Sequence, residues 1–450
     1  MNRLVKSQLI VFILSFLCNL SRHAVLESWI MAKPEVNQTL GFSSTWLGSF
    51  DMVFLMCYAA GNFISGILGD SYPVVMVVSI SMLSAGGVFL IIILLALLNV
   101  THPGAYIGFF GFLGFFFSAV WPGTVAIMGT WFSKGSRGKI LGLWSANTVV
   151  GNIVGSQVAA GLYAEGVSWE YVTVLMVSLL VLVAVAFWAT VDDKVDSALI
   201  TAPGISPREI QAIPERRRIP IRQACMIPGV IFYSLTYSGI KMMNYGLMMW
   251  LPYFLEKKIG VKGEKMGLMV GSYDLGGTIG TIILGWLSDK TKDRILVTTP
   301  VIVLTIPLLF CLKLGTSDTL WYFFILIPLL GAALGGLTCF ISSVVAADLG
   351  QAKANANKEE AKATIAGIVD GSGGIGASLG QFIIGALQEY SWDAVFNFMI
   401  MVCIFSILWT VPIMQSYYKR SKNEYEEEEG GDGKYVKQRT DIENNNNKII

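Results

Sequence analysis

Long, predominantly apolar segments constrain this chain more than any other feature. Of its 450 residues, 54% are hydrophobic and only 14% are charged, whereas a soluble domain carries about 25% charged residues. An apolar segment of about 20 residues crosses a bilayer as a helix. We therefore predict an all-α polytopic membrane protein with twelve transmembrane helices. The predicted spans are residues 8–32, 46–69, 73–99, 103–131, 139–164, 169–190, 223–255, 264–288, 295–314, 319–348, 362–388 and 391–417.

One polar segment divides the chain into two sets of six spans. Residues 191–222 contain four prolines and the run Arg216-Arg217-Arg218, a composition typical of a linker. We predict a six-helix bundle over residues 1–190, a cytoplasmic linker, and a second six-helix bundle over residues 223–418. The polar, low-complexity tail, 419–450, is predicted to be a disordered cytoplasmic segment.

The distribution of basic residues predicts the orientation in the membrane. Most of the 32 Lys and Arg residues fall in segments on the same side as the two termini and the linker. The positive-inside rule then places both termini in the cytoplasm. Asn37 and Asn99 begin Asn-x-Thr triplets in the first two predicted outer loops, so both are candidate glycosylation sites.

A permanent charge, Arg22, lies within the first predicted span. An arginine at the centre of a spanning helix costs roughly 2.5–3.5 kcal/mol on insertion scales. Asn19 and His23 lie beside it on one helical face, because residues four apart are neighbours on a helix. Arg22 is therefore expected to face a polar site, the alternative being a side chain that snorkels to the headgroups.

The two halves contain an internal repeat. The segment Gly66–Asp70 matches Gly285–Asp289 at an interval of 219 residues, and Gly61 matches Gly280 at the same interval. That interval also relates Arg22 to Lys241, the only other Lys or Arg that lies away from the ends of a predicted span. Pseudo-symmetric halves of six helices are typical of transporters whose site lies at the midplane. Two converging cations would bind a dianion or a phosphoryl group.

Further polar residues extend this predicted site. Tyr237, Asn244 and Tyr245 share a face of the seventh predicted span with Lys241. Asp274, in the eighth span, is interpreted either as the partner of Lys241 when substrate is absent or as part of a structural pair.

Charged residues also gather where spans meet the linker side. Asp70 and Arg137 belong to the first half, and Asp289 and Arg294 belong to the second. Opposed charges at such positions favour a gate that closes on this side, the alternative being ordinary helix-end charges.

Several classes of function are excluded by composition. The net charge of +1 gives no reason to expect a nucleic-acid partner. The six cysteines are scattered singly, so no metal or disulfide is predicted. No nucleophile–base constellation appears, and an enzyme or a cofactor is not expected.

The motifs resemble those of the major facilitator superfamily, and in particular its organophosphate:phosphate antiporters, most closely the eukaryotic glycerol-3-phosphate and glucose-6-phosphate exchangers. The resemblance covers residues 8–417. It is carried by Gly66–Asp70, Trp121–Gly123, Trp131–Gly138, Gly142–Trp144, Val150–Ser156, Lys241 with Tyr245, Trp250–Pro252, Asp274–Gly277, Gly285–Arg294 and Asp370–Gly373.

This resemblance implies exchange of a phosphorylated sugar or glycerol phosphate for inorganic phosphate by alternating access. Arg22, Lys241 and Asp274 match functional positions of the family. Asn147 and Thr148 stand where family members carry a histidine in helix 5. The resemblance also implies a monomer in the lipid bilayer, in the endoplasmic reticulum or else in the plasma membrane or another endomembrane.

Two alternatives remain open at this point. The same cations would serve a facilitator of another organic anion, a carboxylate or an acidic sugar, and the missing histidine favours keeping that hypothesis. A non-transporting sensor or structural membrane subunit is the second alternative.

Overall fold

The computed structural model describes residues 3–132, 140–193, 221–227, 229–291, 294–342, 362–416 and 418, and within those ranges it is helical and without strands. The first half contains α1 (Arg3–Thr39), α2 (Ser44–Ser71), α3 (Val74–Leu97), α4 (Gly104–Phe117), α5 (Val120–Trp131), α7 (Asn147–Ala164) and α8 (Trp169–Thr190). Most of the predicted linker and the whole of the predicted tail lie outside the described residues.

The second half repeats this pattern. Its helices are α10 (Ile221–Cys225), α11 (Val230–Phe254), α12 (Gly263–Thr291), α13 (Ile295–Leu314), α14 (Leu320–Leu330), α15 (Gly336–Phe340), α17 (Lys362–Tyr390) and a last helix, Trp392–Ser416. Short π-helical turns, η2 (Leu255–Ile259) and η4 (Gly331–Gly335), and the 3-10 turn η3 (Ser317–Thr319) complete it.

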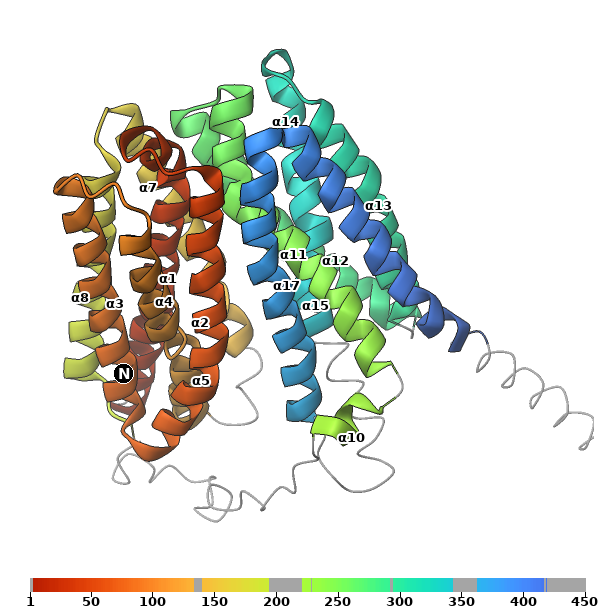
Figure 1. Ribbon diagram of the computed structural model, residues 1–450. Coiled ribbons are helices and arrows are strands. Elements are labelled where there is room, and N and C mark those ends of the chain that lie inside the picture. Colours follow the sequence, from red (N-terminus) through yellow and green to blue (C-terminus); the bar gives the residue numbers. More distant parts are fainter. Residues whose placement is uncertain are drawn as a thin grey trace, which may run out of the picture.

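The predicted spans each correspond to helical structure. In the described part of the chain, nine helices are long and apolar enough to cross a membrane. The helices α7, α11 and α17, of 18, 25 and 29 residues, supply the other three spans and carry much of the polar character. Figure 1 shows the two bundles side by side, with α2 and α17 meeting between them. The fold is therefore the predicted pair of six-helix bundles.

The first helix is longer than predicted, so the first loop begins later in the chain than predicted. We expected the span to end at residue 32, but α1 continues to Thr39. The charge of Lys33 does not end the helix, because its ammonium is paired with the Asp51 carboxylate. Asn37 consequently lies in the last turn of α1 and not in a loop. In the seventh span, Gly229 (φ 93°) separates α10 from α11, because a left-handed residue interrupts a helix.

Repeat-related glycines occupy equivalent places in the two halves. A Cβ at Gly61 of α2 would lie 3.0 Å from the Phe115 carbonyl oxygen, and one at Gly280 of α12 would lie 2.1 Å from that of Ala332. Each glycine lets the second span of its half approach the fourth span closely. The sequence repeat is thus a structural repeat.

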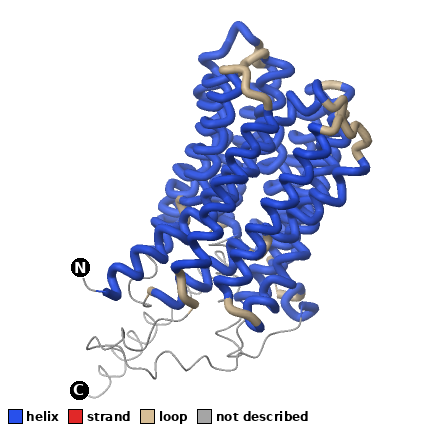
Figure 2. The backbone as a smooth tube through the Cα atoms, turned by 90° about the vertical axis from the view of Figure 1, so that its left-hand side faces the viewer, coloured by secondary structure: helices blue, strands red, loops and turns tan. Residues whose placement is uncertain are grey.

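The two ends of the molecule differ in how closely the halves meet. We call the end of the molecule that carries the start of α1 and of α10 the linker end, and the opposite end the far end. Figure 2 shows the long helices running between these two ends. At the far end, a Cβ at Gly48 of α2 would lie 2.4 Å from the Gln381 carbonyl oxygen of α17. The Thr45 backbone N–H donates to Glu389 Oε1 at 3.0 Å. The halves are therefore in direct backbone contact at the far end.

Candidate functional site

Arg22 lies inside the first half with only 5% of its surface exposed. Its Nη2 donates to Nε2 of His23 at 2.6 Å, and its guanidinium carbon lies 5.9 Å from the centre of the Tyr58 ring. Among the residues that the structure describes, its Nε has no hydrogen-bond partner. A buried guanidinium with an unused donor is suited to bind an anion.

A chain of hydrogen bonds continues from His23 into the second half. His23 Nδ1 lies 3.1 Å from Asn152 Oδ1, and Asn152 Nδ2 donates to Asp274 Oδ1 at 3.0 Å. Because Nε2 accepts from Arg22 and the Asn152 oxygen only accepts, His23 is neutral with its proton on Nδ1. Arg22 and Asp274 are therefore linked across the boundary between the halves.

Lys241 of α11 pairs with Asp370 of α17, so of the two interpretations of Asp274 the one that makes it the partner of Lys241 is wrong in this structure. The Lys241 Nζ lies 2.7 Å from Asp370 Oδ1, and the Tyr237 hydroxyl donates to the same oxygen at 3.3 Å. The Lys241 side chain is 12% exposed and that of Asp370 is 58% exposed. Asp274 projects instead toward Asn152, because α12 lies against α7 at this point.

Tyrosine rings connect the two cations. The Lys241 Nζ lies 5.4 Å from the centre of the Tyr237 ring and 5.9 Å from that of Tyr245. Tyr245 is also within electrostatic range of both Lys241 and Arg22. The two repeat-related cations thus face a common region between the halves.

The remaining predicted residues make local contacts. Asn19 Nδ2 donates to Thr124 Oγ1 at 2.8 Å, and Asn244 Oδ1 accepts from the Tyr273 hydroxyl at 2.7 Å. Asn19 therefore connects two helices of the first half, and Asn244 connects two helices of the second.

Asn147 and Thr148, at the start of α7, also make local hydrogen bonds. Asn147 Nδ2 donates to the Trp144 carbonyl oxygen at 2.6 Å, and Thr148 Oγ1 donates to Asn147 Oδ1 at 3.3 Å. Neither contact reaches Arg22. The place of the absent histidine is thus occupied by side chains that bond to neighbours in their own segment of the chain.

At the linker end, Arg294 Nη1 lies 3.5 Å from Asp289 Oδ1, so this pair is formed within the second half. The Asp289 side chain is largely exposed. Arg137 lies outside the described residues, and nothing is described of the Asp70 side chain.

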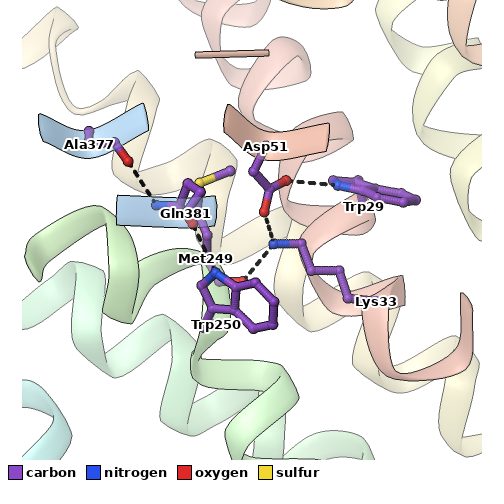
Figure 3. A network of polar contacts seen from close by, with 7 residues as sticks. All are labelled: Trp29, Lys33, Asp51, Met249, Trp250, Ala377 and Gln381. Carbon is purple, nitrogen blue, oxygen red and sulfur yellow. Dashed lines mark hydrogen bonds and ion pairs between the residues drawn. The ribbon is translucent and has the colours of Figure 1, made fainter. Parts of the chain in front are cut away.

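The sequence interpretation missed a network at the far end, drawn in Figure 3. Lys33 pairs with Asp51 and also donates to the Met249 carbonyl oxygen of α11 at 3.0 Å. Beside it, Trp250 Nε1 donates to Gln381 Oε1 at 3.0 Å. The network joins α1 and α2 of one half to α11 of the other. Trp29 and Lys33 are four residues apart and so lie on one helical face, a pattern that indicates the network. The prediction did not include it because the predicted span ended at residue 32.

A second missed residue is Glu27. It is 2% exposed, and its Oε1 has no hydrogen-bond partner among the described residues. The polar stripe of Asn19 and His23 reaches Glu27 at the next four-residue step, so extending the stripe would have found it. Within the described ranges, no group of three His, Cys, Asp or Glu side chains could hold a metal ion.

Two helical bundles in contact, with a charged site between them, define a membrane transporter of the alternating-access type. A family model of the Major Facilitator Superfamily matches residues 11–358. The chain belongs to this superfamily, and it is accordingly a transporter and not an enzyme.

Named relatives and a solved structure agree with this assignment. Over 401 residues, the chain is 33% identical to "Sugar phosphate exchanger 3" of Mus musculus, covering 83% of this chain and 80% of the relative. It is 31% identical over 441 residues to "Putative glycerol-3-phosphate transporter 3" of Arabidopsis thaliana, covering 89% and 85%. The fold is similar to that of a bacterial homolog of the human lysosomal transporter Spinster in an inward-facing, occupied conformation, with a TM-score of 0.69, 14% identity and coverage of 91% and 96%.

Proposed function

We propose that this protein exchanges a phosphorylated sugar or glycerol phosphate for inorganic phosphate by alternating access. The observation that carries the proposal is a pair of largely buried cations, one from each half: Arg22 lies 5.9 Å from the centre of the Tyr58 ring, and Lys241 lies 5.9 Å from the centre of the Tyr245 ring. Relatives named as sugar phosphate and glycerol-3-phosphate transporters support the choice of substrate class.

The two cations have complementary roles in binding. The unused Nε and the remaining N–H groups of Arg22 would bind the phosphoryl oxygens in a fork, each charge-assisted hydrogen bond contributing about 1.5–3 kcal/mol. Lys241 would exchange the Asp370 carboxylate for a phosphoryl oxygen. The rings of Tyr58 and Tyr245 would contact the organic part.

Binding at this place can drive alternation. Arg22 belongs to one half and Lys241 to the other, so a bound phosphoryl group draws the halves together. An empty site leaves Lys241 held by Asp370 within the second half. Return of the empty transporter is therefore less favourable than return with a ligand, which favours exchange over net flux.

Topology and location complete the proposal. Both termini lie in the cytoplasm, the linker end faces it, and the protein acts as a monomer in the endoplasmic reticulum membrane. Asp70, Arg137, Asp289 and Arg294 form the gate at the linker end, with Asp289 and Arg294 already paired at 3.5 Å.

A transport assay tests the function. Proteoliposomes loaded with inorganic phosphate should take up labelled glycerol-3-phosphate or glucose-6-phosphate, and uptake should stop without internal phosphate. Arg22→Ala and Lys241→Ala should each lower uptake by about tenfold or more, the loss of one charged hydrogen bond. The control is Lys258→Ala, because Lys258 pairs with Asp393 away from the site at 3.4 Å.

Competition separates this function from its alternatives. Inhibition by organic carboxylates but not by phosphate would replace the proposal with a facilitator of another organic anion. A reconstituted protein that moves none of these anions, yet changes conformation when they are added, would identify a sensor.

A further inference from the structure

Glu27 is a buried carboxyl for which phosphate exchange supplies no role. It lies on α1 one turn beyond His23, and only 2% of it is exposed. A Cβ at Gly155 of α7 would lie 2.8 Å from the Glu27 Cβ, so the α7 backbone covers this side chain closely. Its Oε1 is buried without a hydrogen-bond partner among the described residues.

The charges around Glu27 do not neutralise it. Asp274 of α12 and Lys33 of α1 are within electrostatic range of its carboxyl. Lys33 is already bound to Asp51 and to the Met249 carbonyl oxygen.

Other charged or titratable groups on the helices around it already make hydrogen bonds, although the Nε of Arg22 has no partner in the described part of the chain. Arg22 and His23 bond each other on α1. On α7, the Tyr163 hydroxyl lies 3.5 Å from the Ser28 carbonyl oxygen, and on α12 the Tyr273 hydroxyl donates to Asn244. Of the two charged groups within electrostatic range of Glu27, the Asp274 carboxyl is the one that forms no ion pair among the described residues.

Arg22, which bonds the neutral His23, supplies one positive charge for two buried carboxyls, neither of which forms an ion pair among the described residues. The two carboxyls therefore retain a proton between them, because both cannot be ionised at an acceptable cost. Glu27 belongs to the first half and Asp274 to the second. We propose that Glu27 and Asp274 form a proton-binding site between the two halves, and that its occupancy couples transport to the movement of protons.

The coupling follows from the position of the pair. A proton on Glu27 Oε1 removes the repulsion between the carboxyls and permits the close contact of the halves at the far end. When that O–H bond breaks and the proton passes to water, two like charges on opposite halves favour their separation. The proton is taken up from one side and released unchanged, so no other reactant is required.

The same pair communicates with the substrate site. Asp274 accepts from Asn152, which contacts His23, which accepts from Arg22. An anion that binds Nη2 of Arg22 breaks the hydrogen bond from Arg22 to His23. Because His23 contacts Asn152, this change also alters the hydrogen bond that Asp274 accepts. This link rests on the proposed function, whereas proton binding itself does not.

Infrared difference spectroscopy on the reconstituted full-length protein, between acidic and alkaline buffer without substrate, tests proton binding directly. We expect a protonated-carboxyl band that is lost in Glu27→Gln and shifted in Glu27→Asp. It should persist in Glu165→Gln, because Glu165 is exposed beyond the end of α7. A band unchanged in Glu27→Gln, or no titrating band, would overturn the proposal whatever the substrate proves to be.

Conformation gives the second readout. Spin labels at Trp46→Cys and Tyr390→Cys, both exposed at the far end, report the separation of α2 and α17 in a chain whose native cysteines are replaced. The labels should move apart as the pH rises in the otherwise unmodified chain and stay close at every pH in Glu27→Gln. Equal pH dependence in both would refute the coupling. A substrate-driven change of internal pH in proteoliposomes, absent in Glu27→Gln, would then tie the site to transport.

Discussion

Lys33 and Asp51 form an ion pair that is closed to solvent, with 0% and 2% of their side chains exposed. Asp51 Oδ1 also accepts from Trp29 Nε1 at 3.3 Å, and the Lys33 Nζ lies 5.0 Å from the centre of the Trp250 ring. Together with the bond from Lys33 to the Met249 carbonyl oxygen, these contacts connect three helices and both halves. The pair therefore stabilises each half internally and also the closed far end.

Replacing Lys33 by Met should destabilise the protein strongly. The substitution leaves Asp51 buried without its counter-ion, which typically costs about 3–5 kcal/mol. The free energy of unfolding, measured by denaturant titration in lipid micelles, should fall by about this amount. Lys313→Met is the control, because Lys313 makes an exposed contact with Asn397. The double variant Lys33→Met/Asp51→Leu should recover most of the lost stability. A double variant as unstable as Lys33→Met alone would contradict the assigned pairing.

Replacing Asp370 by Asn should strengthen phosphate binding. The Asp370 carboxylate is paired with the Lys241 ammonium, to which the anion would bind, and the negative charge of Asp370 also repels the anion. At a partly exposed site the difference is about 1 kcal/mol, or about fivefold in affinity. The phosphate concentration that halves uptake of labelled substrate should fall accordingly. Asp393→Asn, which removes the surface partner of Lys258, should leave that concentration unchanged.

How much of this site the sequence predicts depends on where each charge lies. Arg22 and Lys241 are visible because an isolated cation in an apolar span is rare and because the repeat relates them. Lys33 carries the same charge, but it follows the apolar segment and resembles an ordinary loop residue. Only the tertiary contact with Asp51 shows that the helix continues through it.

Partners are harder to predict than positions. Asp274 and Asp370 both lie in apolar helices, and sequence spacing gives no reason to pair Lys241 with one of them. The choice is made by helix packing: a Cβ at Gly373 would lie 2.7 Å from Lys241 Cδ, which shows how closely α17 approaches α11. Asp274 lies on α12, which packs on α7, and so it pairs with Asn152.

Of the two glycosylation candidates, Asn99 should be modified and Asn37 should not. Asn99 is exposed in the turn after α3 with φ 53°, whereas Asn37 Nδ2 donates to the Phe42 carbonyl oxygen at 2.8 Å from the last turn of α1. Glycosidase treatment should increase the gel mobility of the unmodified chain and of Asn37→Gln, but not that of Asn99→Gln. Because glycans are added on the lumenal side, a shift lost in Asn99→Gln would also support the proposed orientation, and a shift lost in Asn37→Gln would contradict this assignment.

Replacing Gly48 by Val should hold the far end open. A Cβ at Gly48 would lie 2.4 Å from the Gln381 carbonyl oxygen and 3.3 Å from Gly385 Cα, so backbone on both helices would have to move. Overpacking of this kind costs about 1–3 kcal/mol, roughly fivefold to 150-fold in the ratio of closed to open molecules. Spin labels at Trp46→Cys and Tyr390→Cys should show the longer distance, and exchange should slow because the cycle requires closure. Gly87→Val on α3, where an added Cβ meets nothing within 4 Å, should leave both measurements unchanged. A closed far end in Gly48→Val would mean that the α2–α17 contact does not control the opening.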